Sequence, residues 1–242
     1  MLTVVLAGAG TALATGLGVI PVYLLGHRVA ALRPMLFGIA GGVMSVASIV
    51  GLLRPALGQG AVATVAAGLL AGVLFLIVTR LLLQLSDLHV GRLRGADVRT
   101  AVLVFAVLFA HSLPEGFAIG TAYASDPAGI GLFVIVAIAI QNIPEGTSVA
   151  IPMEASGFGH SQQFWAAVGT SAPQPIGALI AFVAVEQITA LLPFSFAFAA
   201  GAMLALVAAE LAPPALAGGW QGAAGLAGGT GLMLGLSALL NV

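Results

Sequence analysis

Long uncharged stretches of apolar residues follow one another along this chain of 242 residues. Each is long enough to cross a bilayer core, which takes roughly 20 apolar residues in a helix. The stretches are continuous rather than alternating, as expected of spanning helices and not of barrel strands. The eight runs cover residues 2–25, 35–53, 60–84, 100–122, 129–153, 163–185, 191–210 and 222–241. We therefore predict an all-α membrane protein with eight transmembrane helices in a single domain over residues 1–242.

The composition excludes several classes of protein. Charged residues make up 6% of the chain, against about 25% in soluble domains. The chain has no cysteine, so a metal ion must be bound by nitrogen, oxygen or thioether ligands. It has no cluster of basic residues for nucleic acid and no G-x-x-x-x-G-K-[ST] motif for ATP. We expect lipid and divalent metal ions as partners, no nucleic acid, and no cofactor apart from a transported ion.

Arginine placement predicts the orientation in the membrane. The chain has no lysine, and its arginines gather near two of the loops between the runs. The first loop has Arg28 and Arg33, the third is flanked by or contains Arg80, Arg92, Arg94 and Arg99, and only Arg54 falls on the other side. Cytoplasmic loops carry the excess of basic residues. We therefore predict a cell-membrane protein with loops one and three in the cytoplasm and both termini outside, the N-terminal run being a membrane helix and not a cleaved signal.

Two of the runs contain the same pattern, thirty residues apart. It reads His-Ser-Leu-Pro-Glu-Gly over 111–116 and Gln-Asn-Ile-Pro-Glu-Gly over 141–146. An ionised carboxylate at the middle of a bilayer costs about 2.5–3.5 kcal/mol on insertion scales. We expect no arginine within a span to neutralise Glu115 and Glu145. A bound cation is therefore the natural source of the missing positive charge.

The spacing within each motif supports a metal site. His111 and Glu115 are four residues apart, as are Gln141 and Glu145, so each pair lies on one helix face. If the two faces meet, an imidazole, two carboxylates and an amide oxygen converge. That set suits zinc, cadmium, iron, cobalt or manganese, whereas calcium prefers oxygen ligands alone. The alternative is that these polar groups only hydrogen-bond one helix to the other.

The paired motifs resemble the fourth and fifth helices of the ZIP (Zrt/Irt-like) metal transporters, whose pattern is close to H-N-x-P-E-G followed by x-x-x-P-E-G. Weaker similarities cover residues 37–44, 171–178 and 196–203, which look like the second, sixth and seventh helices. The resemblance, closest to prokaryotic members, implies a ZIP-like bundle that carries a divalent transition metal, zinc foremost, into the cytoplasm. It also implies an elevator mechanism in which helices one, four, five and six move as a block.

The resemblance implies two adjacent metal positions. The first would be formed by His111, Glu115, Gln141 and Glu145 with Met44 nearby, and the second would share the glutamates and add Ser112, Asn142 and Gln174. Family members commonly have Asn, Asp or Asn, and Glu at those three added positions. This chain has no carboxylate beyond the shared pair, so two divalent ions would leave positive charge uncompensated. We predict that one metal ion binds tightly and not two.

Other functions remain open at this stage. An intramembrane metalloenzyme would need a metal-activated water and a base, as in H-E-x-x-H, which is absent. We therefore do not expect an enzyme. A sensor or assembly subunit that transports nothing is the other alternative. The sequence also leaves open a homodimer, and whether Glu210, near the end of its run, lines an exit path or only reaches the interface.

Overall fold

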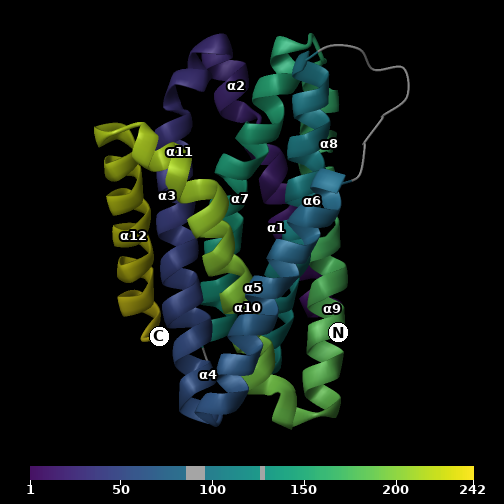
Figure 1. Cartoon of the computed structure of the whole chain (residues 1–242), viewed down its shortest axis with the longest axis vertical. Coiled ribbons are helices and arrows are strands. Elements are labelled where there is room, and N and C mark those ends of the chain that lie inside the picture. Colours follow the sequence, from purple (N-terminus) through teal and green to yellow (C-terminus); the bar gives the residue numbers. More distant parts are fainter. Residues whose placement is uncertain (86–95, 126–128) are drawn as a thin grey trace.

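The computed structural model describes residues 1–85, 96–125 and 129–242, and the regular structure of that part of the chain is entirely helical (Figure 1). With η marking 3-10 or π segments, the elements are α1 (Leu2–Leu17), α2 (Ile20–Leu25), η1 (Gly26–Leu32), α3 (Arg33–Val46), η2 (Ala47–Leu53), α4 (Arg54–Gln59), α5 (Val62–Leu85), α6 (Ala96–Ala124), α7 (Ile130–Ala155), α8 (His160–Thr170), α9 (Pro173–Gln187), η3 (Thr189–Leu191), α10 (Leu192–Leu206), η4 (Val207–Leu211), α11 (Ala212–Ala217) and α12 (Trp220–Leu240).

Consecutive elements join into helices that follow the predicted runs in order. Among the described residues, seven helices are long and apolar enough to cross a membrane, and α6 is the eighth helix of the bundle. The seven are Leu2–Leu25, Arg28–Gln59, Val62–Leu83, Ile130–Ala155, His160–Gln187, Thr189–Ala217 and Trp220–Leu240. The prediction of an all-α membrane bundle is confirmed.

Two of the spans continue beyond the predicted runs. The second and seventh runs end at residues 53 and 210, but α4 and α11 extend these spans to Gln59 and Ala217. Each begins with proline in its first turn, where the missing N–H is not needed for a helical hydrogen bond. A π-helical segment precedes each, η2 before α4 and η4 before α11. The wider π turn lets the helix continue past a residue that would otherwise break it.

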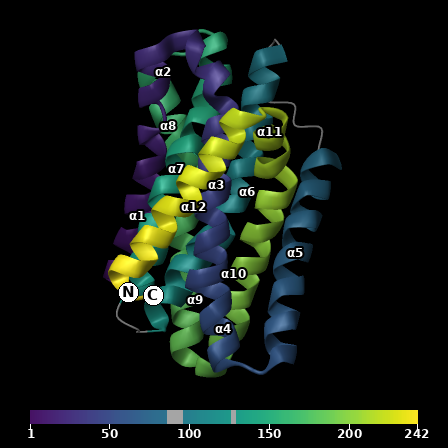
Figure 2. The ribbon, with the colours of Figure 1, turned by 90° about the vertical axis from the view of Figure 1, so that its left-hand side faces the viewer.

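The helices pack as a central group with two flanking helices. α1, α6, α7 and α9 contact one another, α12 lies along α3, and α5 lies along α10 (Figures 1 and 2). Among the seven apolar spans, those formed by α5 and α12 are the least covered by other helices, because only 22% of an 18-residue stretch of each is buried. The two flanking helices therefore present most of their surface to the surroundings, and the four central helices enclose the polar motifs.

The glycine that ends each motif lets two backbones approach closely. A Cβ atom on Gly116 would overlap the carbonyl oxygen of Gln174, and one on Gly146 would overlap that of Thr15. Gly116 thus holds α6 against α9, and Gly146 holds α7 against α1. In lipid, the hydrophobic effect does not drive helices together, because the lipid tails are as apolar as the side chains. Small residues stabilise the contact by letting the two backbones pack closely.

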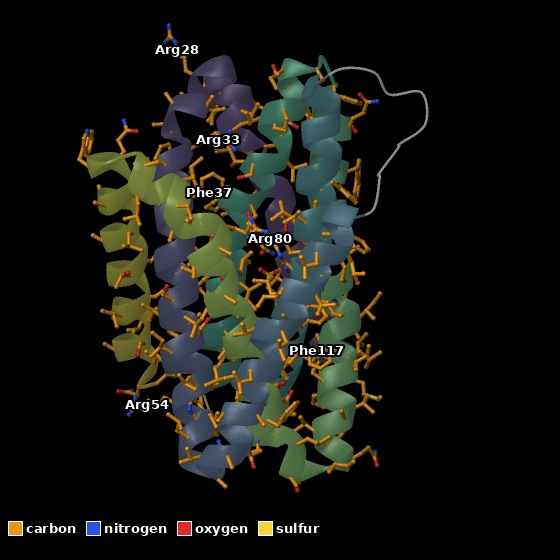
Figure 3. The ribbon with its side chains drawn as sticks, viewed as in Figure 1. Arg28, Arg33, Phe37, Arg54, Arg80 and Phe117 are labelled. Carbon is orange, nitrogen blue, oxygen red and sulfur yellow. The ribbon has the colours of Figure 1, made fainter. Side chains whose placement is uncertain are left out.

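The arginines used to predict orientation lie toward opposite ends of the bundle. Figure 3 shows Arg28 at one end and Arg54 at the other, and both termini lie toward the Arg54 end (Figure 1). Arg92 and Arg94 lie outside the described residues. The arrangement matches the alternation of spans, and which end faces the cytoplasm stays a prediction.

Candidate metal site

The two motifs lie inside helices, as predicted, and their polar side chains face the protein interior. His111 and Glu115 belong to α6, and Gln141 and Glu145 belong to α7. All four are buried, with exposed fractions between 0% and 5%. Both helices continue through their prolines, Pro114 in α6 and Pro144 in α7. The polar centre is therefore built on continuous helices and not on a broken segment.

A short chain of contacts joins the two helices at this level. Gln141 Nε2 donates a hydrogen bond of 2.8 Å to Glu115 Oε1, and the carboxyl groups of Glu115 and Glu145 contact each other. Two acidic groups thus lie together in a site from which water is largely excluded. Such a pair is costly unless protons or a cation reduce its charge.

Several buried polar atoms have no hydrogen-bond partner. Among the described residues they are Ser48 Oγ, His111 Nδ1, Gln141 Oε1, Glu145 Oε1 and Gln163 Oε1. Three of the five belong to the predicted metal ligands. Native proteins pair nearly all buried polar atoms, and an exception calls for an explanation such as a bound ion. These three atoms are therefore free to bind a cation.

The ligands are near one another without forming a closed cage. Within residues 1–85, 96–125 and 129–242, no three His, Asp or Glu side chains are close enough together to hold a metal ion. Binding of a metal ion here would require His111 and the two glutamates to come closer together. The assignment of these side chains as metal ligands stays a prediction.

Two cavities reach the polar centre. A very small one, about 10 Å³, is lined by His111 and Glu115 together with apolar residues of α5 and α10. A larger one, of about 420 Å³, is lined by His111, Glu145, Glu210 and Arg33 among others. Arg33 lies on the Arg28 side of the centre (Figure 3). The larger cavity therefore connects the site with the end of the bundle for which we predict a cytoplasmic location.

On the side of Glu115 that faces α9, away from the large cavity, the polar groups hydrogen-bond one another. Gln174 Nε2, on α9, donates to Glu115 Oε2 at 2.7 Å. Gln174 Oε1 accepts from Thr11 Oγ1 at 2.8 Å and from Asn142 Nδ2 at 3.2 Å. Asn142 Nδ2 also donates to the Thr11 carbonyl at 2.7 Å. This closed network, Thr11–Asn142–Gln174, links α1, α7 and α9 to the Glu115 side chain of α6.

The remaining predicted ligands, Ser112 and Met44, are held by contacts of other kinds. Ser112 Oγ donates to the Leu108 carbonyl of its own helix at 3.0 Å, so its hydrogen is already used. Met44 is fully buried in the main hydrophobic core, on α3. The sulfur is thus placed by apolar packing, and its role as a ligand is untested.

Sequence reasoning missed two residues around the site. The expectation that no arginine lies within a span is wrong, because Arg80 lies within the third span. It pairs with Glu210 and not with a motif glutamate, at 3.3 Å between Nη1 and Oε1. Thr11 was also missed. Its hydroxyl, one of three threonine hydroxyls in the first run, was the available signal for Thr11, and the position of Arg80 inside the run 60–84 was the signal for that residue.

Comparison with known proteins points to one family. A family model described as "ZIP Zinc transporter" matches residues 83–237. The chain is 36% identical over 239 residues to the zinc transporter GufA of Myxococcus xanthus, covering 94% of this chain and 91% of that protein. It is 33% identical over 149 residues to the zinc transporter ZIPB of Bordetella bronchiseptica, covering 61% and 48%. A relative from Arabidopsis thaliana that also carries a zinc-transporter name is 35% identical over 219 residues, which are 88% of this chain and 34% of that protein.

Proposed function

Because the chain belongs to the ZIP zinc transporter family, we propose that it carries zinc across the cell membrane into the cytoplasm through a site on α6 and α7. The three unpartnered atoms His111 Nδ1, Gln141 Oε1 and Glu145 Oε1 carry this proposal. They supply an imidazole, an amide oxygen and a carboxylate beside the second carboxylate of Glu115. This mixture of nitrogen and oxygen donors suits zinc and its borderline neighbours better than calcium or magnesium.

The position of the larger cavity supports inward delivery. It joins Glu145 to the end of the bundle that has Arg33 and Arg28, and arginines near short loops favour the cytoplasmic side. An ion released from Glu145 into this cavity would leave toward the cytoplasm. Sided reconstitution, with the orientation read from protease access to the loop after α5, tests this direction.

The closed network supports an elevator in which α1, α6, α7 and α9 move as a block. Thr11, Asn142 and Gln174 hydrogen-bond these helices to one another and to Glu115. Sliding one helix alone would break several of these buried hydrogen bonds at once, whereas moving the four helices together keeps all of them. Cross-linking of α9 to α10, which lies outside the block, should arrest transport if the block moves.

Zinc uptake into liposomes containing the purified protein tests the transport proposal. Uptake should exceed that of empty liposomes, and Glu115→Ala should remove it. The matched control is Glu186→Ala, since Glu186 lies near the end of α9 and is exposed. Absence of flux for zinc, cadmium, iron, cobalt and manganese would favour a sensor or assembly role. Adding the other metals in competition with labelled zinc measures selectivity, which depends on site geometry.

A further inference from the structure

An ion pair lies where the large cavity passes the seventh span. Arg80, on α5, and Glu210, in the π-helical segment η4, approach to 3.3 Å. It is the one ion pair in the part of the chain that the structure describes. The two side chains are partly exposed, by 45% and 32%. π segments inside helices occur frequently at functional sites, so the position of Glu210 invites a role beyond packing.

Glu210 shares a cavity with the candidate metal site. The cavity of about 420 Å³ is lined by both Glu145 and Glu210, with His111 also on its wall. A cation that leaves Glu145 through this cavity therefore passes a second carboxylate. Arg80 contacts this carboxylate at 3.3 Å, so its charge acts on the cavity through Glu210.

Arg33, the arginine that lines the cavity, contacts an aromatic ring and not Glu210. The Arg33 guanidinium lies over the Phe37 ring, 5.6 Å from the ring centroid, in the geometry of a cation–π contact. Arg80 is therefore the cation that partners Glu210. Without Arg80 the carboxylate would face the cavity with a full negative charge.

The pair is held on two helices that pack tightly. A Cβ atom on Gly72 of α5 would overlap the Phe198 carbonyl oxygen of α10, and one on Gly201 of α10 would overlap that of Leu69. η4 continues directly from α10. Arg80 and Glu210 thus belong to one packed unit, and their contact does not depend on movement of the central helices.

We propose that Arg80 sets the affinity of Glu210 for the passing cation. This inference rests on the proposed transport function. A bare carboxylate in a narrow cavity attracts a divalent ion strongly, and an ion held too firmly does not move on. Conduction requires each stop to be attractive enough to enter and weak enough to leave. Arg80 competes with the cation for Glu210, so Glu210 binds the cation weakly and releases it readily.

The inference makes the two single substitutions unequal. In Arg80→Gln the carboxylate of Glu210 has no competitor, so KM and kcat for zinc should both fall by about tenfold. In Glu210→Gln the positive charge of Arg80 is unpaired beside the cavity, so kcat/KM should fall by about tenfold. The double variant has neither charge and should return to within about threefold of the wild type.

Zinc uptake into liposomes by the four proteins completes this cycle. A double variant that is faster than Glu210→Gln supports the inference, and one that is as slow or slower overturns it. A KM that is unchanged or raised in Arg80→Gln also overturns it. Arg54→Gln is the matched control, since Arg54 is exposed at the opposite end of the bundle and its loss should leave uptake unchanged.

Calorimetric titration with cadmium separates this inference from the transport proposal. Arg80→Gln should gain a second cadmium site that the wild type lacks, and Arg80→Gln/Glu210→Gln should lose it again. If the wild type moves no zinc, the transport proposal fails while this gain still supports the role of Arg80. If Arg80→Gln binds cadmium with the stoichiometry of the wild type, the role of Arg80 is refuted whatever the flux.

Discussion

The two sides of Glu115 differ in how their polar groups are used. On the α9 side, the amides of Asn142 and Gln174 and the hydroxyl of Thr11 hydrogen-bond one another and Glu115 Oε2. On the side of the large cavity, His111 Nδ1 and Glu145 Oε1 have no partner. Both sides are buried and both consist of hydrogen-bonding side chains. Only one of them has lone pairs to offer.

This difference assigns the two sides different roles, since one side orients the Glu115 carboxylate and the other can bind a metal ion. An amide that donates to a carboxylate supplies a hydrogen where a second cation would otherwise lie, and it does so without adding charge. The α9 side therefore orients Glu115 and fills its second oxygen. The cavity side retains the negative charge and the unpaired atoms that can bind a metal ion, so we expect a single metal ion on that side.

The largest effect should come from removing charge on the cavity side. Glu145→Gln keeps the size of the side chain but loses the carboxylate, and zinc affinity should fall by roughly a hundredfold or more. Calorimetry on the purified protein measures this. Glu154→Gln, at the end of α7, should bind zinc like the wild type. Equal losses in the two variants would mean that the site lies elsewhere.

A smaller loss should follow when Glu115 loses its amide partner. Gln174→Leu removes the donor to Glu115 Oε2, so the carboxylate is free to turn away from the cavity side. Removing the partner that orients a metal ligand typically costs about 10–100-fold in affinity. Affinity that stays at the wild-type level in Gln174→Leu would show that the network does not position Glu115.

Restoring charge on the α9 side should change the number of bound ions. Gln174→Glu combined with Asn142→Asp replaces two amides by carboxylates and supplies the negative charge that a second divalent ion needs. Crystals soaked in cadmium should then show two anomalous peaks, separated by about 4 Å as in other two-metal sites, where the wild type shows one. Two peaks of similar height in the wild type would contradict the one-ion prediction.

The smallest effect should come from the far end of the network. Thr11→Val removes the 2.8 Å hydrogen bond to Gln174 Oε1, which should weaken zinc binding by roughly fivefold, the equivalent of about 1 kcal/mol for one hydrogen bond. Thr15→Val is the control, because it breaks the 2.6 Å contact with Ser171 and the 3.5 Å contact with the Thr11 carbonyl but leaves the hydrogen bond from the Thr11 hydroxyl to Gln174 in place. The two variants should lose similar thermal stability, and only the first should lose affinity.

The sequence by itself determined the spans and singled out the polar side chains of the candidate site. The apolar runs predicted the eight helices, because the cost of exposing backbone and charge to lipid is a local property of each stretch. The same cost marked Glu115 and Glu145, and four-residue spacing placed His111 and Gln141 on their helix faces. All four side chains are buried, and Gln141 hydrogen-bonds Glu115 across the two helices.

Only the tertiary structure decided which groups meet across helices. Thr11 and Gln174 are 163 residues apart, and Arg80 pairs with Glu210 from a different span. The sequence periodicity predicted neither contact. The lipid-facing side of a membrane helix is as apolar as its packed side, so the sequence does not show which side packs against another helix. The helices are positioned by close approach at glycines such as Gly116 and Gly146. Those approaches bring Gln174 against Glu115, and so they leave one side of the carboxylate closed and the other open to a cation.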